Sequence, residues 1–127
     1  MKTELSDGEW TLMKALWEFS PMTITELTAK MKDSTGWSKH TIISMLSRME
    51  AKGAVEYQKD ERAKLYFPVL GREDAIRKET GHFLEKVFDG HLGVMLNAMM
   101  DSRKLTQADI DELSAILEKA KEGSSRD

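Results

Sequence analysis

The chain has 127 residues, of which 40% are hydrophobic and 32% charged, and these fractions predict one small folded domain or a domain with an appendage. The net charge of −3 argues against a general polycation, and the lack of cysteine excludes disulfides and thiolate metal sites. No run approaches the roughly 18 apolar residues that span a bilayer. Because the N-terminal "MKTELSDGEW" also lacks an apolar signal core, we expect a cytoplasmic protein without membrane insertion.

The first helix is predicted over residues 7–19. Ser6 and Glu9 have the spacing of a capping box, in which the serine side chain caps the helix and the glutamate reaches back to the serine. Leu5 and Trp10 stand where a hydrophobic staple needs them, and the following Ser-Pro pair ends the helix because proline interrupts it. Helical spacing predicts four buried residues: Trp10, Met13, Leu16 and Trp17.

A second helix is predicted over residues 24–32. Thr23 and Glu26 repeat the capping box, and Met22 and Leu27 repeat the staple. Its apolar spacing predicts three buried residues: Ile24, Leu27 and Met31. The polar stretch "DSTG" then separates this helix from the next one.

The third helix has two contrasting faces. Ser38 caps it, and it ends before Gly53. At about 100° per residue, four apolar side chains fall in one arc of the width expected for a core-facing stripe: Ile42, Met45, Leu46 and Met49. The opposite face is small, polar and basic, with Thr41 beside it: His40, Ser44, Ser47, Arg48 and Ala51.

A β-hairpin is predicted after this helix. Val55 and Tyr57 alternate with polar residues, and the "DER" at residues 60–62 can form the turn. Three apolar residues alternate in the second strand, with Pro68 near the edge: Leu65, Phe67 and Val69. Three helices followed by a hairpin is the order of a winged helix-turn-helix. We therefore predict a mostly α fold with a small β wing, an α+β arrangement whose winged unit occupies residues 1–70.

The outer face of the third helix suits the major groove of DNA. Short side chains permit close approach, hydroxyls can meet base edges or phosphate, and Arg48 can grip the O6 and N7 of guanine. The first turn of the helix favours phosphate, and Ile43, which flanks the face, can contact a thymine methyl. Arg62 and Lys64 lie at or beside the hairpin turn. The predicted DNA-binding residues are Lys39, His40, Thr41, Ile43, Ser44, Ser47, Arg48, Arg62 and Lys64.

Charge supports this prediction and leaves an alternative open. Residues 1–70 carry ten basic and ten acidic side chains, but residues 37–53 carry Lys39, Arg48 and Lys52 against Glu50. A solvated helix face is also polar, and the acidic pair at residues 60–61 counts against DNA contact. In the alternative interpretation, the winged fold is a protein–protein interaction adaptor without sequence-specific DNA binding.

Residues 71–122 show a purely helical pattern. One apolar stripe ends at Gly90, and a short apolar segment follows it. Thr106 and Asp109 then begin a last helix, predicted to run to about residue 121, and residues 123–127 are expected to form a disordered tail. Because these helices have little core of their own, we expect a homodimer with this interface: Phe83, Leu84, Val87, Phe88, Leu92, Leu96, Ile110, Leu113 and Leu117. The alternative is that these side chains pack back onto the winged unit.

No catalytic, metal or cofactor constellation is visible. The three histidines include no pair at i, i+4 spacing, and Asp89 with His91 provides only two potential ligands. No nucleophile has a base placed near it, and no glycine-rich phosphate loop follows a strand. We therefore expect neither an enzyme nor a bound cofactor or metal.

The segments "LSDGEWTLMKALWEFSPMTITEL", "GWSKHTIISMLSRMEAKGAVEY" and "YFPVL" resemble the penicillinase-repressor family, and "ETGHFLEKVFDGHLGVMLNAMMDSRKLTQADIDELSAILEK" resembles its dimerisation region. The resemblance covers nearly the whole chain. It implies a homodimeric bacterial repressor that binds a double-stranded DNA operator through the third helix and the wing. Carried over to this chain, the family's DNA contacts imply His40, Thr41, Ser44 and Arg48, supported by Arg62 and Lys64.

This chain departs from the family at three places. Lys39-His40 replaces a frequent Pro-Lys pair and Ile43 replaces a basic or polar residue, which implies a different operator sequence. In β-lactam-responsive members a sensor-protease triggers cleavage at an Asn-Phe bond, and the matching dipeptide here is Asn97-Ala98. A sensor-protease is therefore a partner only if cleavage tolerates alanine. Copper-responsive members bind metal through cysteines, which this chain lacks.

Overall fold

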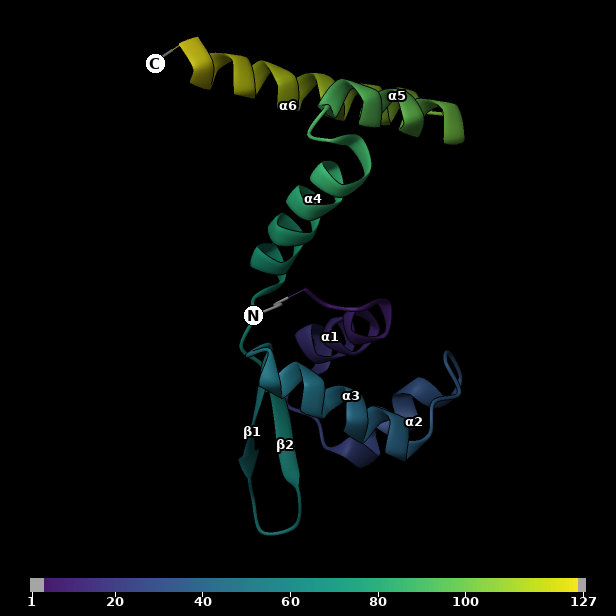
Figure 1. Ribbon diagram of the computed structural model, residues 1–127, viewed down its shortest axis with the longest axis vertical. Coiled ribbons are helices and arrows are strands. Elements are labelled where there is room, and N and C mark those ends of the chain that lie inside the picture. Colours follow the sequence, from purple (N-terminus) through teal and green to yellow (C-terminus); the bar gives the residue numbers. More distant parts are fainter. Residues whose placement is uncertain (1–3, 126–127) are drawn as a thin grey trace. The chain divides into compact units, whose positions relative to one another are not determined.

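The computed structural model describes residues 4–125, which form six helices and one antiparallel two-stranded sheet (Figure 1). The elements follow in the order α1 (Asp7–Phe19), α2 (Ile24–Lys32), α3 (Lys39–Ala51), β1 (Val55–Lys59), β2 (Lys64–Pro68), α4 (Arg72–Phe88), α5 (Leu92–Ser102) and α6 (Gln107–Ser125). This order confirms the mostly α fold with a small β wing. The chain divides into two compact units between Gly81 and His82, within α4, whereas the sequence placed the boundary after residue 70.

The predicted helix starts are formed as capping boxes. The Ser6 hydroxyl accepts from the Glu9 N–H at 3.2 Å, and the Glu9 carboxylate accepts from the Ser6 N–H at 2.8 Å. Thr23 with Glu26, and Thr106 with Asp109, form the same reciprocal pairs. These bonds satisfy N–H groups that the first turn of a helix leaves without intrahelical partners.

The core of the N-terminal unit lies among α1, α2, α3 and the first strand. Eight apolar side chains are fully buried: Leu12, Met13, Leu16, Leu27, Ile42, Leu46, Met49 and Val55. The prediction for α1 was wrong for Trp10 and Trp17, which are only half-buried, and Ile24 of α2 is also half-buried. The indole N–H of Trp17 donates to the Leu70 carbonyl at 2.9 Å, and this polar contact keeps the ring at the edge of the core.

The wing is an antiparallel hairpin in which Tyr57 pairs with Tyr66 and Lys59 with Lys64. Tyr66 is the buried residue of β2, and the predicted positions Leu65 and Phe67 are only half-buried, while Val69 is 50% exposed. The reason is that Met22 and Tyr66 exchange both backbone hydrogen bonds, at 2.8 and 3.0 Å, which ties this point of β2 to the helical core. The predicted alternation was therefore shifted by one residue.

The C-terminal unit consists of the last turns of α4 together with α5 and α6. Gly90 has a φ of +82°, which only glycine adopts readily, and it follows the end of α4 as predicted. The helix α6 continues to Ser125, so residues 123–125 of the predicted disordered tail are helical, and residues 126–127 lie outside the described residues. Among the described residues, no helix combines the length and apolar character needed to cross a bilayer.

Candidate nucleic-acid interface

The core fixes which face of α3 points outward. Ile42, Met45, Leu46 and Met49 are each at most 7% exposed, so the predicted inner arc is confirmed. The Ser38 hydroxyl caps the first turn by accepting from the Thr41 N–H at 3.2 Å. With these contacts the helix cannot rotate about its axis without exposing apolar surface.

The start of α1 packs directly on α3. A Cβ added at Gly8 would collide with the terminal methyl of Met45 and would touch the Trp37 ring at 3.5 Å. Any larger residue at this position would require the Met45 side chain to move. Sequence reasoning missed this contact, because Gly8 and Met45 are far apart in the chain.

The predicted DNA-contacting residues of α3 lie on its outer face. Lys39, His40, Ser44, Ser47 and Arg48 are exposed, and Ile43 is 40% exposed. Thr41 is half-buried, and its hydroxyl lies 3.1 Å from that of Ser38, so it takes part in the cap. The structure thus gathers the predicted residues of α3 on one surface, which we call the outer face.

Lys52 does not belong to this surface. It follows the last residue of α3, and its ammonium donates to the Glu9 carboxylate at 2.5 Å and to the Glu4 carbonyl at 2.7 Å. Burial raises the pKa of Glu9, but hydrogen bonds from Lys52 and Ser6 outweigh it, so the pKa lies below its usual value of 4.5. The ion pair joins the end of α3 to the start of α1, and the basic stripe expected from sequence loses one of its three cations.

The wing tip is organised by Asp60. Its carboxylate accepts from the backbone N–H groups of Arg62 at 2.9 Å and Ala63 at 3.0 Å, and these bonds hold its pKa below the usual value. From the sequence, Asp60 was expected to oppose DNA contact, but the structure gives it a role in shaping the turn. Arg62 and Lys64 are both exposed. The Lys64 ammonium lies 4.3 Å from the centre of the Tyr57 ring.

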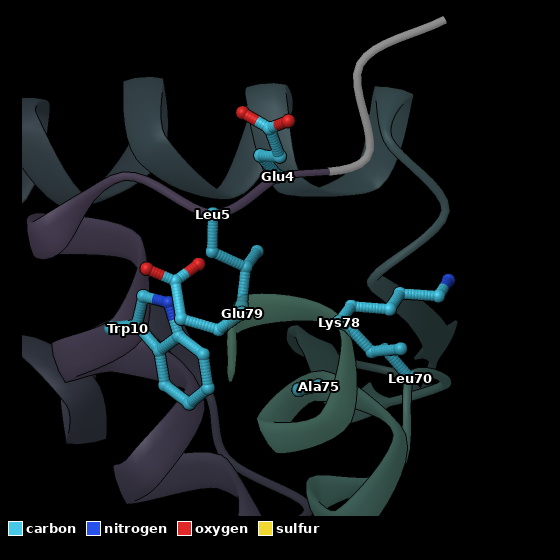
Figure 2. A pocket seen from close by; sticks show the side chains of 7 residues that line it. All are labelled: Glu4, Leu5, Trp10, Leu70, Ala75, Lys78 and Glu79. Atoms are coloured by element: carbon cyan, nitrogen blue, oxygen red, sulfur yellow. The ribbon is translucent and has the colours of Figure 1, made fainter. Parts of the chain in front are cut away.

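The N-terminal unit also contains a small cavity where the first turns of α4 meet the segment before α1 (Figure 2). Leu5 and Trp10, the predicted staple, line it together with Glu4, Leu70, Ala75, Lys78 and Glu79. Its volume of about 30 Å³ has room for a water molecule or two. Within the described residues, no three His, Cys, Asp or Glu side chains are grouped to hold a metal ion.

The C-terminal unit exposes much of its apolar surface. Of the side chains described between residues 82 and 123, none is buried. Leu84, Phe88 and Leu96 of the predicted interface are half-buried, and the other six are at least 37% exposed. The rings of Phe83 and Phe88 pack edge to face, with 5.8 Å between their centres. Asn97 and Ala98, the dipeptide that matches the cleaved bond of β-lactam-responsive repressors, are exposed within α5.

The chain is similar to known penicillinase repressors in both sequence and structure. Residues 5–119 match the family described as "Penicillinase repressor". The penicillinase repressor of Bacillus licheniformis is 31% identical over 118 residues, which cover 93% of this chain and 92% of that protein. The solved DNA-binding domain of the repressor BlaI aligns at 33% identity with a TM-score of 0.53, covering 58% of this chain and 93% of that domain. A solved complex of monomeric Bacillus licheniformis BlaI with the blaP half-operator aligns at 32% identity with a TM-score of 0.50, covering 56% and 87% of the two chains.

Proposed function

Because this chain belongs to the penicillinase repressor family, we propose that it is a transcriptional repressor that binds a near-palindromic operator as a homodimer. The observation that carries the proposal is the match over residues 5–119, which contains α3, the wing and the helices that follow. The relative solved with a half-operator supports DNA as the ligand of the winged unit.

In this proposal the outer face of α3 enters the major groove. Ser44 and Ser47 are short, so the helix backbone can approach the base edges closely, and Arg48 can donate two hydrogen bonds to one guanine. Lys39 and His40 stand at the first turn, where the helix N-terminus favours phosphate. The helix would then be positioned by phosphate contacts at its start and would read bases further along.

The wing would hold the DNA backbone beside the groove. Arg62 and Lys64 supply the positive charge, and the Asp60 turn fixes where Arg62 stands. The phosphate contacts of α3 and the wing together predict an affinity that falls steeply as the salt concentration rises.

The exposed apolar surface of the C-terminal unit supports a homodimer. A unit in which no described side chain is buried gains little hydrophobic stabilisation alone, and a second copy would cover residues such as Phe83, Leu113 and Leu117. Two winged units related by a two-fold axis would read two half-sites, and their spacing would set that of the operator.

A sensor-protease is the inactivating partner to test. Asn97 and Ala98 lie inside α5, so a protease would have to unwind that helix before cutting the bond between them. Incubation with a cognate protease and mass determination of the fragments would show whether this bond is cut.

The function is tested by selecting genomic fragments with the purified full-length protein and sequencing those it retains. We expect a recurring near-palindrome upstream of a few genes, with retention that declines as salt is raised. If no sequence is enriched even at low salt, the repressor proposal fails, and the protein–protein interaction adaptor becomes the favoured alternative.

A further inference from the structure

Ile43 is chemically unlike the rest of the outer face. Among the exposed side chains of α3, all of which the structure describes, it is the only large apolar one. It is 40% exposed, whereas its neighbour Ile42 is fully buried. The residues one turn away on the same side, Lys39 and Ser47, are polar, so Ile43 belongs to no apolar cluster on this surface.

A single exposed isoleucine is normal on a protein surface in contact with water. On a helix that enters the major groove, however, it would lie against base edges and phosphates. The groove presents hydrogen-bond donors and acceptors on the base edges and phosphates along its walls, and isoleucine can pair with none of them. The apolar group that the base edges offer there is the C5 methyl of thymine. The same methyl group is present on 5-methylcytosine.

We infer that Ile43 is a specificity-determining residue that reads a pyrimidine C5 methyl group in each half of the operator. The inference rests on the proposed function, because it requires α3 to lie in the major groove. Covering one methyl group corresponds to about a fourfold gain in affinity per half-site, or about fifteenfold for a dimer that reads two. Unmethylated cytosine at this position would present no methyl group and would place its amino group against an apolar side chain.

The test uses the operator recovered by genomic selection. Each thymine in turn is replaced by deoxyuridine, which removes only the methyl group, and dissociation constants are measured for the wild type and for Ile43→Ala. We expect one position per half-site where deoxyuridine weakens the wild type about fourfold and leaves Ile43→Ala unaffected. Ser47→Ala, on the same face, is the matched control and should keep the wild-type response to deoxyuridine.

A second arm distinguishes the two sources of the methyl group. At the sensitive position the pair is changed to cytosine–guanine or to 5-methylcytosine–guanine. The wild type should bind the methylated site about fourfold more tightly, and Ile43→Ala should bind both sites equally. If no thymine is sensitive, each cytosine of the operator in turn is replaced by 5-methylcytosine, and tighter binding by the wild type but not by Ile43→Ala would identify methylated DNA as the natural partner of Ile43.

Three results would overturn the inference. The first is an operator in which no single thymine methyl and no cytosine methyl affects binding. The second is a methyl effect that persists in Ile43→Ala, because another residue would then read it. The third is failure to recover any operator, which defeats the proposed function and this inference with it. Because Ile43 is exposed, thermal unfolding of Ile43→Ala should match the wild type, so a folding defect would not explain its response.

Discussion

Arg48 and Lys52 lie one helical turn apart at the end of α3, but their side chains have different surroundings. Arg48 is exposed on the outer face, whereas the ammonium of Lys52 binds Glu9 and the Glu4 carbonyl. A count of basic residues along the helix cannot separate these two roles. The geometry gives Lys52 the anchoring of α3 and leaves Arg48 on the outer face, where we propose the DNA contact.

Replacing Arg48 with alanine should weaken operator binding by about 1–3 kcal/mol and relax the preference at one base pair, because a two-bond contact with guanine is lost. Titrations of operator variants at one salt concentration measure both effects. The control is Arg77→Ala, which removes the same charge from an exposed position on α4. Equal losses in the two variants would mean that Arg48 contributes only bulk charge.

Glu9 should govern part of the stability of the N-terminal unit. It is 1% exposed and receives hydrogen bonds from Lys52 and Ser6, so Glu9→Gln should lower the free energy of unfolding by about 1–3 kcal/mol at pH 7. Urea unfolding followed by tryptophan fluorescence reports on this unit. The exposed Glu56→Gln serves as the control and should unfold at nearly the wild-type urea concentration.

The same carboxylate predicts a pH dependence. Because the pKa of Glu9 in the folded state lies below its usual 4.5, its stabilisation is complete above pH 4.5 and is lost as the pH falls through the lower, folded-state value. The wild type should therefore lose stability more steeply below pH 4.5 than Glu9→Gln does. If the free energy of unfolding falls equally with pH in the two proteins, Glu9 is not the source of the pH dependence.

At the scale of the elements, the wing depends on one turn. Asp60→Ala removes the acceptor for the N–H groups of Arg62 and Ala63, so the turn should loosen and operator affinity should fall by about 1 kcal/mol. Removal of a negative charge would by itself favour DNA binding. Asp60→Asn controls for this, since it keeps an oxygen acceptor without the charge, and it should bind at least as tightly as the wild type. If Asp60→Ala binds the operator more strongly than the wild type, the negative charge of Asp60 affects the affinity more than the shape of the turn does.

The elements also show what the sequence could and could not predict. The bounds of α1 to α3, the capping boxes and the end of α4 depend on neighbours three or four residues away, which a pattern contains. The pairing of Lys52 with Glu9 joins residues 43 positions apart, and the burial of Tyr66 depends on a backbone bridge to Met22. Such contacts depend on how the elements pack together, and no local pattern records them.

For the whole molecule, the decisive property is assembly. Leu117 is 61% exposed on the predicted interface, so Leu117→Glu should dissociate the homodimer with little effect on the monomer fold. Sedimentation should find a dimer for the wild type and a monomer for the variant, and operator affinity should approach that of a half-site. Lys119→Glu alters charge on the opposite side of α6 and should remain dimeric. If the wild type sediments as a monomer at all concentrations, the proposed homodimer is wrong.

The proposed function depends above all on recognition of a base sequence by the outer face of α3. The most direct test is the ratio of affinities for the recovered operator and for a shuffled sequence, measured for the wild type and for a variant with Ser44, Ser47 and Arg48 replaced. Alanine replaces Ser44 and Ser47, and glutamine replaces Arg48. We expect a ratio of about 10³ or more for the wild type and a ratio near one for the variant, while both proteins still bind the shuffled sequence weakly. A variant that keeps the wild-type ratio would contradict this proposal.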